Sequence, residues 1–181
     1  GEPATAYGRS KRAAEEVVLD AGVKYGMRVV NLRLAMVYGR GSRGNLWKMA
    51  QAIRKGWFPS LPELGNRRSL VHVQDVVEAA RLVITRPEAS GRTYIVADAH
   101  PYSTHEIEAT IRTALQVRSY WSVPAWALRT AGKLHPRLSE LVNRLTDSAC
   151  YTPKRIEHEL GWQARVRLHE GIHEMLGDSI S

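Results

Sequence analysis

YGRSKRAAEEVVLDAGVKYGMRVVNLR, residues 7–33, is the stretch that decides the fold class. Good helix formers and apolar residues at helical spacing predict a helix over residues 7–24. The run 28–33, which contains Val29, Val30 and Leu32, then predicts a strand, which leads into the turn-like residues 38–41. A helix followed directly by a strand is typical of α/β proteins.

The rest of the chain continues this alternation. We expect strands over 69–73 and 93–97 and an irregular loop over 57–66, where two prolines and a glycine interrupt regular structure. The expected helices are 45–55, 75–85, 103–115 (where Ser103 and Glu106 have capping-box spacing), 124–132, 137–145, 153–160 and 168–177. Strands separated by helices predict an α/β fold with a parallel sheet, followed by a helix-rich carboxyl-terminal part.

The composition restricts the classes of protein. The 181 residues are 44% hydrophobic, which is enough for a real core in one domain or slightly more. A single cysteine excludes an internal disulfide framework and suits the cytoplasm, and no apolar run is long enough to span a membrane. The net charge of +8 suits a polyanion, namely nucleic acid, an anionic membrane surface or a phosphorylated substrate. The cations are mostly dispersed along the sequence, so a nucleic-acid binder rests on charge alone.

Tyr7 and Lys11 are the first candidate catalytic residues. At i and i+4 they share one face of the expected helix, where an ammonium favours the phenolate form of a tyrosine. Such a pair can shuttle a proton to or from a hydroxyl or carbonyl substrate. With seven Tyr and six Lys the spacing arises by chance in about one such chain in five, so an exposed tyrosine beside a surface lysine is the alternative.

Two kinds of site are missing from the pattern. No Gly-x-Gly-x-x-Gly or Gly-x-x-Gly-x-x-Gly follows an expected strand, so we see no dinucleotide phosphate loop. The chain therefore looks like the back part of something larger. His169 and His173 are spaced i,i+4 but lack an evident acidic third ligand, and we expect no metal site.

Five motifs follow one another in register. They are Tyr7-x-x-x-Lys11, NLRLAMVYG (31–39), GNL (44–46), RRSLVHVQD (67–75) and ELGW (159–162). In this order they resemble the extended short-chain dehydrogenase/reductase family, in its NAD-dependent epimerase/dehydratase group. The nearest likeness is to UDP-glucose 4-epimerase-like and UDP-4-keto-sugar reductase-like members of bacterial surface-polysaccharide pathways. The resemblance covers residues 7 to about 176.

The resemblance implies the C-terminal part of a Rossmann-type doubly wound parallel sheet plus a smaller helix-rich substrate-binding domain. Residues 1–40 and about 69–100 would be the remnant of the Rossmann-type domain. Residues 41–68 and about 101–181 would form the nucleotide-sugar domain. The half that carries the glycine loop would be absent from this sequence, and we expect the chain alone to be inactive.

The resemblance also implies roles for eight residues, with NAD or NADP as the cofactor and a UDP-sugar as the substrate. Tyr7 would be the catalytic acid/base, Lys11 would bond the nicotinamide ribose, and the backbone at Leu34 would border the nicotinamide. The substrate residues would be Asn45 and Leu46 on the nucleotide-sugar, Arg68 on UDP, Arg144 on phosphate and Asp147 on ribose.

The sequence departs from the family pattern at several positions. Met36 stands where many 4-epimerases carry asparagine, and Arg40 replaces a common proline. An aromatic residue to stack on uracil is not obvious, with Phe58 and Leu61 as the candidates. These departures favour a related sugar chemistry over galactose epimerase proper.

Some of these residues also have purely structural interpretations. Arg33 could close a strand end, and Asn45 and Asp75 could each cap a helix. His72 fits a packed strand residue. Gly161 and Trp162 fit a helix end followed by a core aromatic residue.

Three functions remain open for the intact protein. The first is a UDP-sugar 4-epimerase that oxidises C4 transiently, the second an NAD(P)H-dependent UDP-4-keto-sugar reductase, and the third a non-catalytic binding module, which the missing phosphate loop favours. The sequence does not name the sugar. We also expect a homodimer formed through the helix over residues 8–24, which carries Ala13, Ala14, Val17, Val18 and Ala21.

Overall fold

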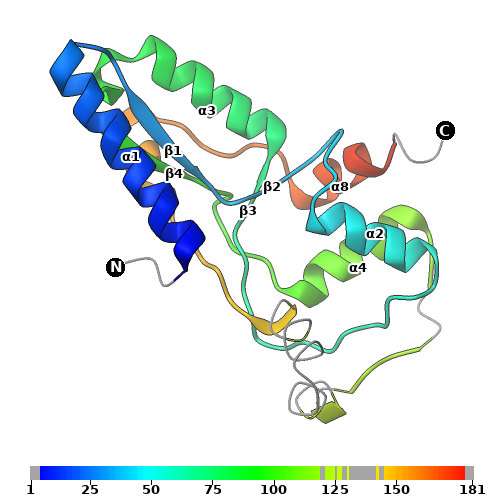
Figure 1. Ribbon diagram of the computed structural model, residues 1–181. Coiled ribbons are helices and arrows are strands. Elements are labelled where there is room, and N and C mark those ends of the chain that lie inside the picture. The colour runs from blue at the N-terminus through cyan, green and yellow to red at the C-terminus, as the bar shows by residue number, and fades with distance from the viewer. Residues whose placement is uncertain are drawn as a thin grey trace.

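The computed structural model describes residues 5–118, 121–124, 126–127, 130, 142 and 145–177, so the expected helices 124–132 and 137–145 lie largely outside it. Helices and strands alternate along the chain (Figure 1). The helices are α1 (Ala6–Tyr25), α2 (Asn45–Arg54), α3 (Val73–Thr85), the short 3-10 helix η1 (Pro87–Ala89), α4 (Thr104–Leu115), α7 (Lys154–Leu160) and α8 (Leu168–Gly177). The strands are β1 (Val30–Leu34), β2 (Met36–Tyr38), β3 (Leu70–His72) and β4 (Arg92–Val96).

All strand pairs in the described residues are parallel, which confirms the α/β prediction. β1 pairs with β4, and β2 pairs with β3. The chain changes partner at one residue, because the Ala35 N–H donates to the Val96 carbonyl (3.0 Å) and the Met36 N–H donates to the Ser69 carbonyl (3.4 Å). β2 replaces the start of the turn that we expected at Tyr38, since Tyr38 is fully buried and lies opposite His72.

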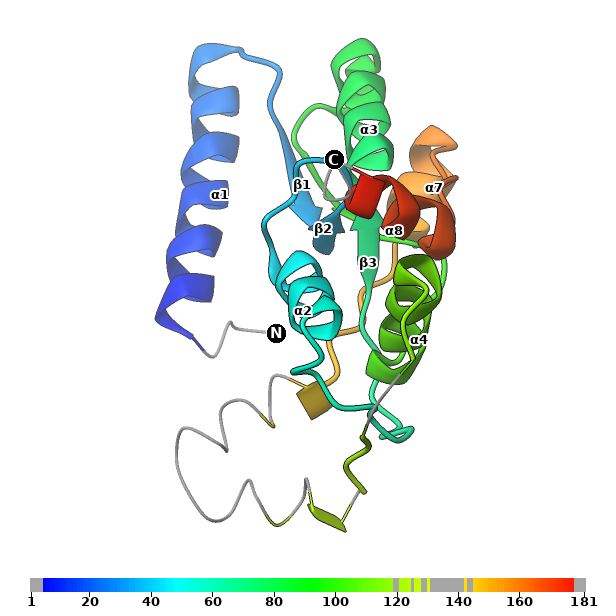
Figure 2. The same ribbon diagram turned by 90° about the vertical axis from the view of Figure 1, so that its right-hand side faces the viewer.

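The first core surrounds the β1/β4 pair. It contains Val71 of β3, Ala79 of α3, Val96 of β4 and Trp162 after α7, all buried. Figure 2 shows α1 on one side of this pair and α3 and α7 on the other. On the α1 side Gly22 lies against Val29, and a Cβ at Gly22 would overlap that side chain.

The second core lies between α2, α4 and α8. It contains Ile53, Ile107, Ile111 and Met175, all at most 2% exposed, together with Leu70 of β3. Gly171 allows α8 to approach the strands, because a Cβ there would lie 2.6 Å from the Tyr38 ring and 2.7 Å from the His72 ring. Ile156, Leu160 and Trp162 of the carboxyl-terminal part belong to the first core, whereas α8 belongs to the second. The division of the chain into two domains stays a prediction.

The helix ends follow the sequence in part. The capping box of Ser103 and Glu106 is present, and Gly161 ends α7 at φ 70° before the buried Trp162, as expected. The structural interpretations of Asn45 and Asp75 as caps were wrong, because Gly44 precedes α2 and His72 precedes α3. Among the described helices, none combines the length and apolar character that crossing a bilayer requires.

Candidate functional site

Tyr7 and Lys11 line one cavity of about 670 Å³, which we call the Tyr7 cavity. Its walls come from α1, from Leu34 at the end of β1 and from Tyr151. Tyr7 is 72% exposed, and the Lys11 Nζ lies 5.6 Å from the centroid of its ring. The i,i+4 pair therefore lies on one face of α1 beside Leu34, as the sequence predicts.

Polar contacts fix this face of α1 against β1. The Thr5 Oγ1 accepts from the Gly8 N–H (3.0 Å) at the start of the helix. Arg33 on β1 makes a two-pronged ion pair with Glu15 of α1, at 2.6 Å between Nη2 and Oε2 and 3.0 Å between Nε and Oε2. The hydrogen bond to Glu15 raises the pKa of Arg33. Arg33 therefore has a structural role, because it aligns α1 with β1.

Arg68, Asn45 and Leu46 line a second cavity of about 290 Å³, which we call the Arg68 pocket. Met36 of β2 and Phe58 are also in its wall, whereas Leu61 is 2% exposed and does not line it. The pocket is also lined by Lys48 of α2, Thr104 of α4 and Leu145. Among the described residues that line it, the pocket is mostly apolar, with two cations and no acidic residue.

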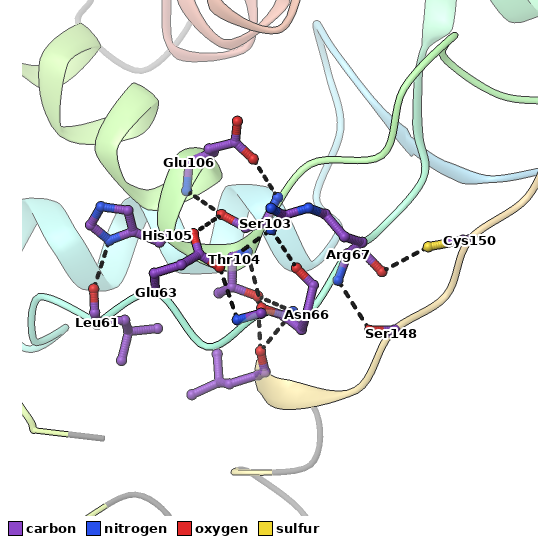
Figure 3. Close-up of polar contacts among 12 residues, drawn as sticks. Leu61, Glu63, Asn66, Arg67, Ser103, Thr104, His105, Glu106, Ser148 and Cys150 are labelled. Carbon is purple, nitrogen blue, oxygen red and sulfur yellow. Dashed lines mark hydrogen bonds and ion pairs between the residues drawn. The ribbon is translucent and has the colours of Figure 1, made fainter. Parts of the chain in front are cut away.

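A network of hydrogen bonds ties the loop that follows α2 to the start of α4 (Figure 3). The His105 Nδ1 lies 2.7 Å from the Leu61 carbonyl, and the Ser103 hydroxyl donates to Glu63 Oε2 at 2.9 Å. These contacts lie at opposite ends of the segment 61–63. The hydrogen bonds from Gly65 and Ser103 lower the pKa of Glu63, so this carboxylate is a stable acceptor. The loop is therefore fixed rather than free to follow a ligand.

An ion pair between Glu108 and Arg112 of α4 also contacts the backbone of this loop. Glu108 is 1% exposed, accepts from the Leu61 N–H (3.0 Å) and pairs with Arg112 Nε. Arg112 also donates to the Phe58 carbonyl at 2.8 Å. Phe58, which lines the Arg68 pocket, is thus positioned by charged groups on α4.

The backbone of Arg68 is held from two sides. Its N–H donates to the Tyr102 carbonyl, and its carbonyl accepts from the Tyr102 N–H, each at 2.8 Å. Arg68 also forms a parallel bridge with Ala149. The neighbouring Asn66 donates to Thr104 Oγ1 (2.7 Å) and to the Leu145 carbonyl (3.1 Å), as Figure 3 shows for Asn66 and Thr104. These bonds bring the residues after 145 against the pocket, although they are far away in sequence.

The structure does not bring all eight predicted site residues together. Asp147 is exposed and lies two residues from Leu145 of the Arg68 pocket, but it does not line that pocket. Arg144 lies outside the described residues. Sequence reasoning missed Tyr151 in the Tyr7 cavity and Lys48 and Thr104 in the Arg68 pocket. Lys48 could have been found, since it lies one helical turn after Asn45.

Asp98 is a further buried group that the sequence analysis missed. It follows β4, is 4% exposed, and its N–H donates to the Leu70 carbonyl at 2.7 Å. Burial, with repulsion from Asp75, raises the pKa of Asp98 to about 7, and the Tyr102 hydroxyl offsets part of this increase. The pKa of Tyr102 rises to about 12, mainly through its own burial. Asp75 itself accepts the backbone N–H groups of Arg165 (3.0 Å) and Val166 (3.1 Å).

His72 is fully buried, as the structural interpretation predicts. Its Nδ1 accepts from the Gln74 N–H (3.4 Å), and its Nε2 lies 3.4 Å from Glu174 Oε2. Within the described ranges, no cluster of three or more His, Cys, Asp or Glu residues could hold a metal ion.

A family model for the NAD dependent epimerase/dehydratase family matches residues 2–97, which include Tyr7, Lys11, Leu34 and Arg68. The chain belongs to this family. It is 31% identical over 177 residues to a UDP-glucose 4-epimerase of Vibrio cholerae, a match that covers 95% of this chain and 53% of that protein. The chain thus spans about half the length of the curated relatives it matches.

Solved structures of epimerases and related enzymes share the fold. The Bordetella bronchiseptica enzyme WbmF, solved with NAD+ and UDP, has a TM-score of 0.72 at 17% identity, over 97% of this chain and 52% of its own. UDP-N-acetylglucosamine 4-epimerase from Bacillus cereus has a TM-score of 0.69 at 16% identity, over 99% of this chain and 54% of its own. These likenesses confirm the predicted Rossmann-type α/β fold of this epimerase/dehydratase family chain.

Proposed function

We propose that the intact protein containing this chain is a UDP-sugar 4-epimerase that works by transient oxidation at C4. The observation that carries the proposal is the Tyr7 cavity, in which Tyr7 and Lys11 lie beside Leu34 at the end of β1. The 31% identity to a UDP-glucose 4-epimerase supports this choice within the family.

The Tyr7 cavity fits the nicotinamide end of NAD or NADP. Leu34 is 45% exposed at the end of β1, so its backbone can border a flat ring. Lys11 makes no ion pair with any residue of the described ranges, and its ammonium is available to the hydroxyls of a ribose. The chemistry that a bound nicotinamide would supply here is reversible hydride transfer at C4 of the sugar. Because the sequence has no glycine-rich phosphate loop, we expect the chain alone to bind the cofactor weakly and to be inactive.

The residues of this chain would handle the proton and hold the substrate. Tyr7, with Lys11 beside it, would accept the proton of the sugar 4-hydroxyl as hydride leaves C4, and would return it after the 4-keto sugar has rotated in the site. Arg68 would contact the UDP portion through its guanidinium fork, with Asn45 and Leu46 on the nucleotide-sugar. Arg144 and Asp147 stay proposed contacts to phosphate and ribose.

The test is turnover of UDP-sugars by the intact protein. We expect interconversion of 4-epimers without net consumption of NAD(P)H. Tyr7→Phe should reduce kcat by about 10²-fold or more, because it removes the proton acceptor. Tyr25→Phe, an exposed tyrosine at the other end of α1, is the matched control and should keep full activity.

A 4-keto-sugar reductase is the second candidate, and Met36 in the Arg68 pocket favours it because a polar side chain is expected there in many 4-epimerases. Net NAD(P)H consumption on a UDP-4-keto sugar, with no interconversion of epimers, would replace the first proposal by this one. The third candidate is a non-catalytic binding module. Titration of the 181-residue chain with NAD and with UDP distinguishes this module from an enzyme. Binding of UDP without binding of NAD would support the module.

We further propose that the intact protein is a cytoplasmic homodimer. The apolar residues of α1 named for this role are accessible, with Val17 67% and Val18 41% exposed. Sedimentation at several concentrations tests the dimer, and a monomer at every concentration would contradict it.

A further inference from the structure

The positive charge of this protein is distributed unevenly. Two long stretches, 21–62 and 109–139, contain no acidic residue at all. They carry 13 of the 26 Lys and Arg residues, so their net charge is +13 and that of the rest of the chain is −5. Half of the cations therefore lie in two stretches of sequence that contain no acidic residue.

The fold joins these two stretches. The Ser60 N–H donates to the Trp121 carbonyl (3.0 Å), and the Val123 N–H donates to the Ser60 carbonyl (3.1 Å). The Trp121 indole N–H also donates to the carbonyl of Gly56 (3.4 Å), the residue before Trp57. Figure 1 and Figure 2 both show the segment around residues 121–124 at the lower end of the molecule, far from α3.

Three exposed indoles lie in the two segments that these hydrogen bonds join. Trp57 is 72%, Trp121 49% and Trp126 70% exposed, whereas Trp162 is buried in the first core. Lys55 lies over the Trp57 ring, with Nζ 5.0 Å from its centroid, and Arg118 is exposed on the same segment as Trp121. We call Lys55, Trp57, Arg118, Trp121 and Trp126 the Trp57 surface. A folded chain that can bury Trp162 gains nothing for its stability by leaving three indoles in water.

We propose that the Trp57 surface binds an anionic phospholipid membrane. Tryptophan concentrates at the boundary between head groups and acyl chains because its ring is apolar and its N–H is polar. Lysine and arginine next to such rings keep their charge among the anionic head groups while their methylene stems lie along apolar groups. Three indoles with two cations suit this boundary better than a nucleic-acid backbone, where cations carry most of the affinity. The surface is separate from the Tyr7 cavity and from the Arg68 pocket, so the proposal is independent of the proposed function.

The experiment is co-sedimentation of the 181-residue chain with vesicles of phosphatidylcholine that contain about 30% phosphatidylglycerol. We expect binding to these vesicles, with a blue shift of tryptophan emission, and little binding to pure phosphatidylcholine. The variant Lys55→Gln/Trp57→Ala should lower the partition coefficient about tenfold or more. Trp126→Ala, a milder change, should weaken binding in the same direction.

Lys24→Gln/Tyr25→Ala is the matched control. Lys24 also lies over an exposed aromatic ring, at 5.2 Å from the Tyr25 centroid, but on α1. This double variant should bind vesicles like the wild type, and circular dichroism should show that all variants are folded. Absence of binding to anionic vesicles, or equal weakening by both double variants, would overturn the proposal. Binding to single-stranded DNA without binding to vesicles would also overturn it and assign the surface to nucleic acid.

Discussion

Replacement of Asp98 by Asn should change how the stability of this protein depends on pH. Asp98 is 4% exposed, and burial together with the charge of Asp75 raises its pKa from 3.8 to about 7. The folded state therefore prefers the neutral carboxyl. Stability from this group is fully present below about pH 3.8 and is lost as the pH rises towards 7, because the unfolded chain then releases a proton that the folded chain retains.

The size of the effect follows from the two pKa values. Each unit of difference corresponds to 1.36 kcal/mol, so relative to low pH the raised pKa lowers the free energy of unfolding by about 4 kcal/mol at pH 8 and by only about 1 kcal/mol at pH 4.5. Asparagine has nearly the same shape and carries no charge. We therefore expect the free energy of unfolding of Asp98→Asn, relative to that of the wild type, to increase by about 3 kcal/mol from pH 4.5 to pH 8. Tyr102, whose pKa is about 12, titrates above this range and does not interfere.

The assay is urea unfolding of both proteins at several pH values, with the difference in free energy of unfolding as the readout. Other titrating groups cancel in this difference. Asp20→Asn, at an exposed position of α1, is the control for the chemical change from aspartate to asparagine. Wild-type and Asp98→Asn stability curves that run parallel from pH 4.5 to 8 would refute the reasoning.

Two other substitutions test the walls of the Arg68 pocket. Arg68→Gln in the intact protein should weaken UDP binding by about 10- to 100-fold in calorimetry, the value of a charge-assisted hydrogen bond, whereas Arg67→Gln should not, because Arg67 contacts Glu63 and does not line the pocket. Equal losses in both variants would contradict this assignment. Glu108→Ala should lower the free energy of unfolding by about 3–5 kcal/mol, since it removes the buried carboxylate that pairs with the half-buried Arg112 and accepts from the Leu61 N–H. Glu106→Ala, which removes only the exposed member of the capping box, should cost about 1 kcal/mol, and similar costs for the two variants in urea unfolding would count against a buried clamp.

The sequence predicted the helices and most strands well because the residues that form each element are close together in the chain. Helical spacing and the Ser103 capping box lie within a few residues of each other, and so do the Gly161 helix end and its helix. β2 was missed because three residues after Ala35 give no alternating pattern, and its strand character comes from pairing with β3. The cap of α3 was also predicted wrongly because of a contact distant in sequence. The Asp75 carboxylate accepts the backbone N–H groups of residues 165 and 166, and His72 caps the helix instead.

Some residues of the candidate site are close in sequence and could be predicted, whereas others are brought together only by the fold. Tyr7 and Lys11 are four residues apart on one helix, so the sequence alone places them together. Tyr151 and Leu145 reach the two cavities only because the segment 145–151 hydrogen-bonds to residues 66–69, more than 75 positions earlier. The raised pKa of Asp98 depends on burial between elements that no sequence pattern reveals.

The change of strand partner at Ala35 links the two cavities. Leu34, still paired with β4, borders the Tyr7 cavity, and Met36, already paired with β3, borders the Arg68 pocket. Two residues along an extended chain span about 7 Å, roughly the length of one sugar ring with its substituents. We infer that a nucleotide-sugar with its reacting carbon at Tyr7 can extend past Ala35 to place its anionic part near Arg68. A substitution at Ala35, which is 7% exposed, would alter this spacing without touching either proposed contact, and should therefore reduce kcat while UDP binding is retained.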